Sequence, residues 1–100
     1  MPNRIDDKFT ALRAAGRRGL IAYIAAGDPT LAQTKALALA FADAGVDVLE
    51  LGVPFSDPLA DGVVNQMAAA RALASGTTVR GVLDLVVEIR RTSEIPIVLY

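Results

Sequence analysis

Two observations in the sequence predict an α/β protein with parallel strands. Short apolar runs alternate with longer amphipathic stretches along the chain, which is typical of parallel strands joined by right-handed helical crossovers. The apolar runs are also too short to form independent helices and are bounded by glycine or proline, as buried strands often are. We therefore expect a parallel sheet with helices packed on it.

Each element is expected from its hydrophobic pattern and from the residues at its ends. Residues 4–15 have the apolar spacing of a short amphipathic helix, and the run LIAYIAA at 20–26 indicates a buried strand. In GDPT, Asp28 is the candidate N-cap and Pro29 the first residue of a helix that stops at Gly45. The remaining elements are expected to be a strand at 46–53, a helix at 64–75, a helix capped by Thr77 or Thr78, and a strand that begins within 95–100.

This order of elements is that of the start of a (β/α)8 TIM barrel. A complete barrel takes about 250 residues, and the chain has 100. We therefore expect only the first three strands and their helices, with residues 1–100 forming the N-terminal part of a single barrel domain. The chain also ends within an apolar run, which leaves a sheet edge without a partner and indicates a truncated barrel.

The composition narrows the chemistry that the chain can perform. It contains no cysteine and no histidine, which excludes disulfides, thiolate catalysis, imidazole acid–base chemistry and the usual zinc sites, so no metal is expected. Proton transfer must then be carried out by carboxylates, lysine, tyrosine or water.

The net charge and the hydropathy of the sequence indicate its partners and its cellular location. The net charge of −1 gives no electrostatic reason to expect nucleic acid or a charged membrane as a partner. No apolar stretch approaches the length of a membrane span, and the N-terminal MPNRIDDKF lacks the apolar region of a signal peptide. We therefore expect a cytoplasmic protein.

Glu50 is the most informative single residue because it lies in the middle of the apolar strand VDVLELGV. Strand alternation places Glu50 and Gly52 on one face and puts Leu49 and Leu51 on the other. In a barrel the Glu50 face points inward, where apolar neighbours disfavour the charged carboxylate and Gly52 leaves room for a ligand. The alternative is a structural glutamate paired with a basic residue of a neighbouring strand.

The loop that follows this strand, residues 54–62, holds two prolines, two aspartates and a glycine. Barrel enzymes carry their catalytic loops at this end of the strands, and the prolines help to preorganise the acidic groups. Asp61 is close enough to Glu50 in the chain to return over the barrel mouth. Alternatively, Asp57 and Asp61 are turn formers or helix N-caps, and for Asp57 alone we favour that interpretation.

The segment AGVDVLELGVPFSDPLADG closely resembles the signature of the tryptophan synthase α-subunit family. The resemblance extends over the whole chain and includes GDPT after the first strand, the pattern Gln66…Arg71…Gly76, and IPIVLY as the third strand. The sequence departs from the family at one clear point. The family usually reads ADGP, whereas Val63 follows Gly62 here, which leaves this loop less rigid.

The resemblance implies a lyase that cleaves indole-3-glycerol phosphate to indole and glyceraldehyde 3-phosphate by a retro-aldol step. By analogy, Glu50 would be the general acid and base, and Asp61 would hold the indole N–H and stabilise its developing positive charge. Tyr23 and Tyr100 fall where the family lines the indole pocket with apolar or aromatic groups. The alternative for both tyrosines is ordinary core packing.

The resemblance also implies a partner. In the family the α subunit binds a β subunit within an α2β2 complex, and the β subunit carries pyridoxal phosphate and receives the indole through a tunnel. Pro54, Asp57 and Pro58 are then candidate interface residues, and no cofactor is expected in this chain itself.

The last expectation concerns the segments that bind the substrate phosphate in the family. The family holds it with glycine-rich loops and a helix N-terminus late in the barrel, which these 100 residues do not include, so we expect the chain to be inactive alone. Two alternatives stay open, namely another barrel isomerase or lyase with a phosphate substrate, and a non-catalytic barrel fragment.

Overall fold

The computed structural model describes residues 2–56 and 60–100. The chain forms three strands and four helices in these ranges, in the order and of the types that the sequence predicts. In chain order they are α1 (Arg4–Ala14), β1 (Ile21–Ala25), α2 (Leu31–Ala44), β2 (Val48–Gly52), α3 (Val63–Ala74), α4 (Val79–Arg90) and β3 (Ile97–Leu99).

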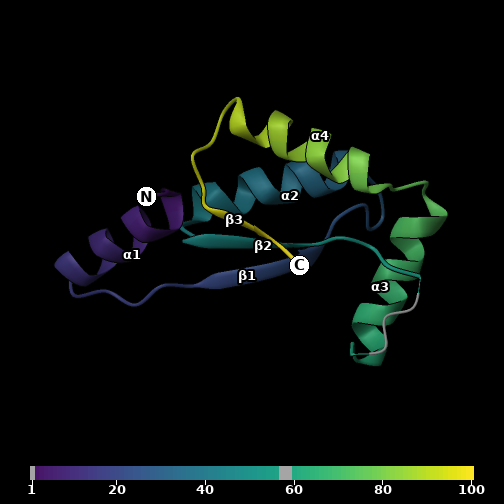
Figure 1. Cartoon of the computed structure of the whole chain (residues 1–100), viewed down its shortest axis with the longest axis horizontal. Helices are drawn as coiled ribbons and strands as arrows, with labels where there is room; N and C mark the ends of the chain where they lie inside the picture. Colours follow the sequence, from purple (N-terminus) through teal and green to yellow (C-terminus); the bar gives the residue numbers. More distant parts are fainter. Residues whose placement is uncertain (1, 57–59) are drawn as a thin grey trace.

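The three strands form one parallel sheet in the order β1-β2-β3. Figure 1 shows α2 and α4 side by side on one face of this sheet, α1 near the end where the strands begin, and α3 beyond their carboxyl ends. This arrangement confirms the predicted α/β fold with the first three strands of a (β/α)8 barrel. The carboxyl ends of the strands, where barrels carry their sites, therefore lie beside α3.

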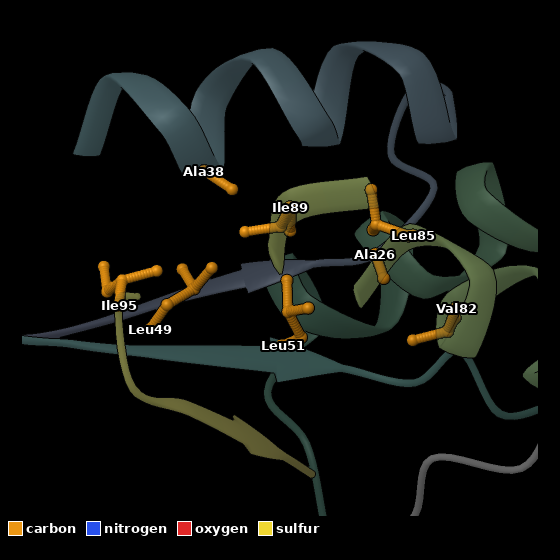
Figure 2. Packing of buried hydrophobic residues seen from close by; sticks show 8 residues of the cluster. All are labelled: Ala26, Ala38, Leu49, Leu51, Val82, Leu85, Ile89 and Ile95. Carbon is orange, nitrogen blue, oxygen red and sulfur yellow. The ribbon is translucent and has the colours of Figure 1, made fainter. Parts of the chain in front are cut away.

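The hydrophobic core lies between the sheet and the helices α2 and α4. Leu49 and Leu51 of β2 are fully buried there against Val82 and Ile89 of α4, and Ala38 of α2 lies above them (Figure 2). Burying one leucine side chain contributes about 1.5–3 kcal/mol. The leucines of β2 therefore face the helices, as the alternation predicts, and Glu50 faces the other way.

The start of α2 differs from the sequence-based prediction. Asp28 is not its N-cap and Pro29 is not its first residue, because Thr30 is the N-cap and accepts a hydrogen bond from the Gln33 backbone N–H at 3.2 Å. The reason is that the Asp28 carboxylate is already paired with Arg71 of α3. The Asp28–Pro29 peptide bond is cis.

Two other predicted helix ends are confirmed. Gly45 ends α2 in the left-handed region, with a φ of 100°, which a residue with a side chain rarely adopts. Of the two threonines proposed as caps of α4, Thr78 accepts the hydrogen bond from Gly81 N–H. Thr77 is buried instead.

Replacing Leu51 by Ala is expected to lower the free energy of unfolding by about 2–5 kcal/mol, because the substitution leaves a cavity in the core. Urea denaturation of the complete protein measures the change. Leu37→Ala on α2 is the matched control, since Leu37 is 42% exposed and its truncation removes little buried surface. Equal losses in the two variants would contradict the position of the core.

Candidate functional site

The register of the sheet determines which side chains lie next to one another at the site. Tyr23 of β1 is paired with Glu50 of β2, and Glu50 is paired in turn with Val98 of β3. Paired residues of parallel strands point to the same face. Tyr23 and Glu50 therefore lie side by side on the face opposite Leu49 and Leu51.

A cavity of about 540 Å³ opens at the carboxyl ends of the strands. Its size is within the range of pockets that bind small molecules. Among the described residues that line it, the polar side-chain groups are the Asp61 carboxylate and the hydroxyls of Tyr23 and Tyr100. The other lining residues are Ala25, Gly52, Val53, Pro54, Phe55, Ala60, Ala69 and Val79.

The ring of Tyr23 lies across β2 at Gly52. A methyl group at Gly52 would overlap the Tyr23 hydroxyl and ring, so only glycine permits this close approach. The sequence predicts room for a ligand beside Gly52. The Tyr23 side chain occupies the space directly over Gly52, and Gly52 itself still lines the cavity.

Tyr23 and Tyr100 form an aromatic pair in the cavity wall, which also includes Phe55. Their rings meet edge to face, with centroids 6.3 Å apart and planes at 87°, which is a favoured geometry for aromatic pairs. Tyr23 is 36% exposed and Tyr100 is 66% exposed. Neither tyrosine is part of the helix-covered core of the described residues.

The two predicted carboxylates, Glu50 and Asp61, both influence the Tyr23 hydroxyl. Partial burial raises the pKa of this hydroxyl, and the negative charges of Asp61 and Glu50 raise it further. A neighbouring negative charge acts in this way because it disfavours the phenolate. Asp61 from the loop and Glu50 from the strand are therefore both within electrostatic reach of one point in the site.

Glu50 is half-buried on the open face of the sheet. The sequence predicts an inward position for Glu50 among apolar side chains, and the three strands supply only part of that enclosure. Within residues 2–56 and 60–100, no basic side chain forms a salt bridge with Glu50. In this part of the chain, the alternative of a structural ion pair is wrong.

Asp61 immediately precedes α3 without capping it. Gly62 is the N-cap of this helix and contributes no side-chain hydrogen bond. The alternative interpretation of Asp61 as the N-cap of α3 is therefore wrong, and Asp61 is one of the residues that line the cavity. The side-chain amide of Gln66 donates a hydrogen bond to the Asp61 carbonyl oxygen at 2.7 Å.

Helix α3 also holds the loop between β1 and α2. The Arg71 guanidinium donates to both carboxylate oxygens of Asp28, at 2.8 and 3.0 Å. The Ser75 hydroxyl donates to the Gly27 carbonyl oxygen at 3.0 Å. Gly27 has a φ of 94°, and a methyl group there would overlap the Thr77 side chain, so the loop requires glycine at this position.

Gln66 and Arg71 are part of the family pattern in the sequence, but their contacts could not be predicted from it. Asp28, which the sequence predicts to cap α2, pairs with Arg71 instead. The available signal was an arginine within the alanine-rich stretch MAAARALA. On a helix that buries only small side chains, one long basic residue is well placed to pair with an acidic loop nearby.

Three residues are predicted to contact a partner subunit: Pro54, Asp57 and Pro58. Pro54 lines the rim of the cavity, whereas Asp57 and Pro58 lie outside the described residues. The described residues contain no group of three or more acidic, histidine or cysteine side chains that could hold a metal ion. None of the helices in the described part of the chain is long and apolar enough to cross a membrane.

The fold and the site together define a class of protein. Parallel strands carry helices on one face, and acidic and aromatic side chains gather at the carboxyl ends beside the loops. That combination is characteristic of a (β/α)-barrel with its site at the carboxyl ends of the strands.

Comparison with known proteins identifies the family within this class. The family model described as tryptophan synthase alpha chain matches residues 9–100, and the chain therefore belongs to that family. The tryptophan synthase alpha chain of Alkalilimnicola ehrlichii is 55% identical over 98 residues, which cover 97% of this chain and 36% of that protein. The corresponding protein of Citrifermentans bemidjiense is 48% identical over 97 residues, with the same two coverages.

Solved structures support the same assignment. The α subunit of tryptophan synthase from Legionella pneumophila matches 99% of this chain and 38% of its own, with a TM-score of 0.95 and 42% identity. A chain of the tryptophan synthase α2β2 complex from Pyrococcus furiosus matches 81% of this chain and 32% of its own, with a TM-score of 0.77 and 46% identity. The chain thus spans 36% of the length of the two curated relatives above.

Lowering the pH is expected to remove the stability that the Asp28–Arg71 pair supplies. Hydrogen bonds from Arg71, helped by its positive charge and opposed by partial burial, hold the pKa of Asp28 below its ordinary value of 3.8. Because the folded-state pKa is lowered, the stabilisation is present above the unfolded-state pKa and is lost as the pH falls through the folded-state value.

The measurement compares Asp28→Asn with the unsubstituted complete protein by urea denaturation. We expect the variant to be less stable at about pH 7 and the difference to shrink by about pH 2.5. Asp84→Asn is the control, since the Asp84 side chain is 69% exposed on α4. A difference between Asp28→Asn and the unsubstituted protein that stays constant over this range would rule out the pairing as its source.

Proposed function

We propose that these residues act within a complete tryptophan synthase α chain that cleaves indole-3-glycerol phosphate to indole and glyceraldehyde 3-phosphate. The observation that carries the proposal is that both predicted carboxylates lie near Tyr23: Glu50 is paired with Tyr23 across the strands, and Asp61 lines the same cavity as Tyr23. The chain belongs to the family of that name, and its mostly apolar and aromatic cavity suits an indole ring.

The cleavage requires two proton transfers. The indole carbon that leaves must gain a proton, and the glycerol hydroxyl must lose one as its carbon becomes the aldehyde carbon. The electrons of the broken carbon–carbon bond stay with the indole ring. We assign both transfers to Glu50, because the chain has no histidine or cysteine to perform them.

Asp61 is assigned a second role in the same step. Protonation of the indole carbon leaves positive charge on the ring, and a carboxylate near the ring nitrogen stabilises that charge while accepting the N–H hydrogen bond. Asp61 lines the cavity together with Tyr23, and Glu50 is the residue paired with Tyr23 on the neighbouring strand. The two carboxylates can therefore act on different parts of one substrate.

Tyr23 and Tyr100 are proposed to bind the indole ring. Both tyrosines line the cavity, and their edge-to-face pair presents an aromatic wall. A wall of this kind favours a flat aromatic ligand through burial and ring–ring contact.

The partner assignment is also a proposal. We infer that the complete chain binds a tryptophan synthase β subunit, through a surface that includes Pro54, Asp57 and Pro58, and that pyridoxal phosphate belongs to that subunit. The similarity to a chain of the Pyrococcus furiosus α2β2 complex supports this inference. We further propose that the protein is cytoplasmic.

Glu50→Gln and Asp61→Asn are each expected to lower the rate of indole release by about 10²–10⁴-fold, as the loss of acid–base or charge-stabilising groups does. The measurement is indole release from indole-3-glycerol phosphate by the complete α chain. Asp84→Asn and Glu88→Gln, carboxylate-to-amide changes on α4, are the matched controls and should leave the rate unchanged.

Circular dichroism should show the same fold in all four variants. A rate within about twofold of the unsubstituted enzyme in either site variant would remove that residue from its assigned role. The polypeptide of residues 1–100 alone is expected to release no indole, because it lacks the phosphate-binding loops late in the barrel. A panel of other phosphate substrates tests the alternative of a different barrel isomerase or lyase.

A further inference from the structure

Gln66 makes two hydrogen bonds to the backbone at the start of α3. Its side-chain Nε2 donates a hydrogen bond to the Asp61 carbonyl oxygen at 2.7 Å. Its backbone N–H donates to the Gly62 carbonyl oxygen at 2.9 Å. One residue therefore holds the carbonyl groups of two successive residues, and the first of them is the one whose carboxylate lines the cavity.

The side-chain bond constrains the direction in which the Asp61 carboxylate points. The Asp61 carbonyl belongs to the rigid peptide plane between Asp61 and Gly62. Fixing that plane limits rotation at the Asp61 Cα and so limits where its side chain can lie. Gly62 contributes no side-chain cap, and glycine restrains its own backbone less than any other residue.

The helix that carries Gln66 is itself anchored at its far end. Arg71 holds Asp28 through two hydrogen bonds, and Ser75 holds the Gly27 carbonyl. On the same helix, Ala69 and Ala72 are buried, and their small side chains permit close packing. Through its hydrogen bond to the Asp61 carbonyl oxygen, Gln66 thus holds the loop that carries Asp61 in place relative to the anchored helix.

We propose that Gln66 is a positioning residue for Asp61 in the indole-releasing reaction. The assignment rests on the proposed function, because it gives Asp61 its role at the indole nitrogen. Gln66 acts through the Asp61 backbone and does not contact the substrate. Its essential feature is an N–H donor at the end of a side chain long enough to reach the carbonyl.

The test uses three substitutions at Gln66 in the complete α chain. Gln66→Met and Gln66→Glu keep the length of the side chain but lose the donor, and Gln66→Lys keeps a donor. We expect the first two to lower kcat for indole release about five- to thirtyfold, with KM changed less than about twofold, because a misplaced catalytic group mainly affects the transition state. Gln66→Lys should recover most of the lost rate.

Two controls separate positioning from folding. Asn65→Ala changes the neighbouring exposed residue of α3 and should leave kcat unchanged. In an Asp61→Asn background, Gln66→Met should lower the residual rate by less than about twofold, since residues that act as a unit are not additive. A purely structural role would instead lower the melting temperature and affect the rate equally in both backgrounds.

Hydrogen exchange gives a readout that does not depend on activity. The amides of residues 66–69, which are the first to donate hydrogen bonds within α3, should exchange about tenfold faster in Gln66→Met than in Asn65→Ala, because the start of the helix opens more often. Unchanged exchange, or an unchanged kcat in Gln66→Met, overturns the positioning role. A third outcome is faster exchange in Gln66→Met when the unsubstituted complete chain releases no indole. That outcome overturns the proposed function and the positioning role in that reaction, but it keeps the structural constraint on Asp61.

Discussion

Strand β2 places successive side chains on opposite faces of the sheet, and both the core and the candidate site depend on that alternation. Leu49 and Leu51 are buried under α2 and α4. Their burial fixes which face of β2 packs against the helices and the position of the strand along them. The same geometry forces Glu50 and Gly52 onto the other face. A slip of one residue would bury the carboxylate in the core and expose the leucines, so hydrophobic burial sets the position of the site.

Helix α3 supplies the second constraint, which concerns the loops rather than the sheet. Its polar side chains reach in two directions, to Asp28 before α2 and to the Asp61 backbone after β2. Loops at the mouth of a barrel have few packing contacts of their own. Their geometry is therefore determined by hydrogen bonds to a helix whose own position is set by buried alanines and by the Gly27–Thr77 approach.

The order of the elements, the two faces of β2 and the end of α2 at Gly45 could be predicted because each depends on local sequence. The pairing of Asp28 with Arg71 could not, since the two residues are 43 positions apart and only the packing of α3 brings them together. The same holds for Tyr23 across Gly52, which depends on the register of two strands. The enclosure of Glu50 was overestimated because burial depends on every strand around the residue, and three strands leave one face open.

A crystal structure of the complete α chain carrying Glu50→Gln, with indole-3-glycerol phosphate bound, tests the central claim most directly. We expect the indole ring against Tyr23 on the Gly52 face of the sheet, with its N–H donating to the Asp61 carboxylate at about 2.7–3.2 Å. The substituted side chain at position 50 should lie next to the bond that breaks. A substrate bound elsewhere, or an indole nitrogen held by another residue, would contradict the claim that β2 and its following loop form the catalytic site.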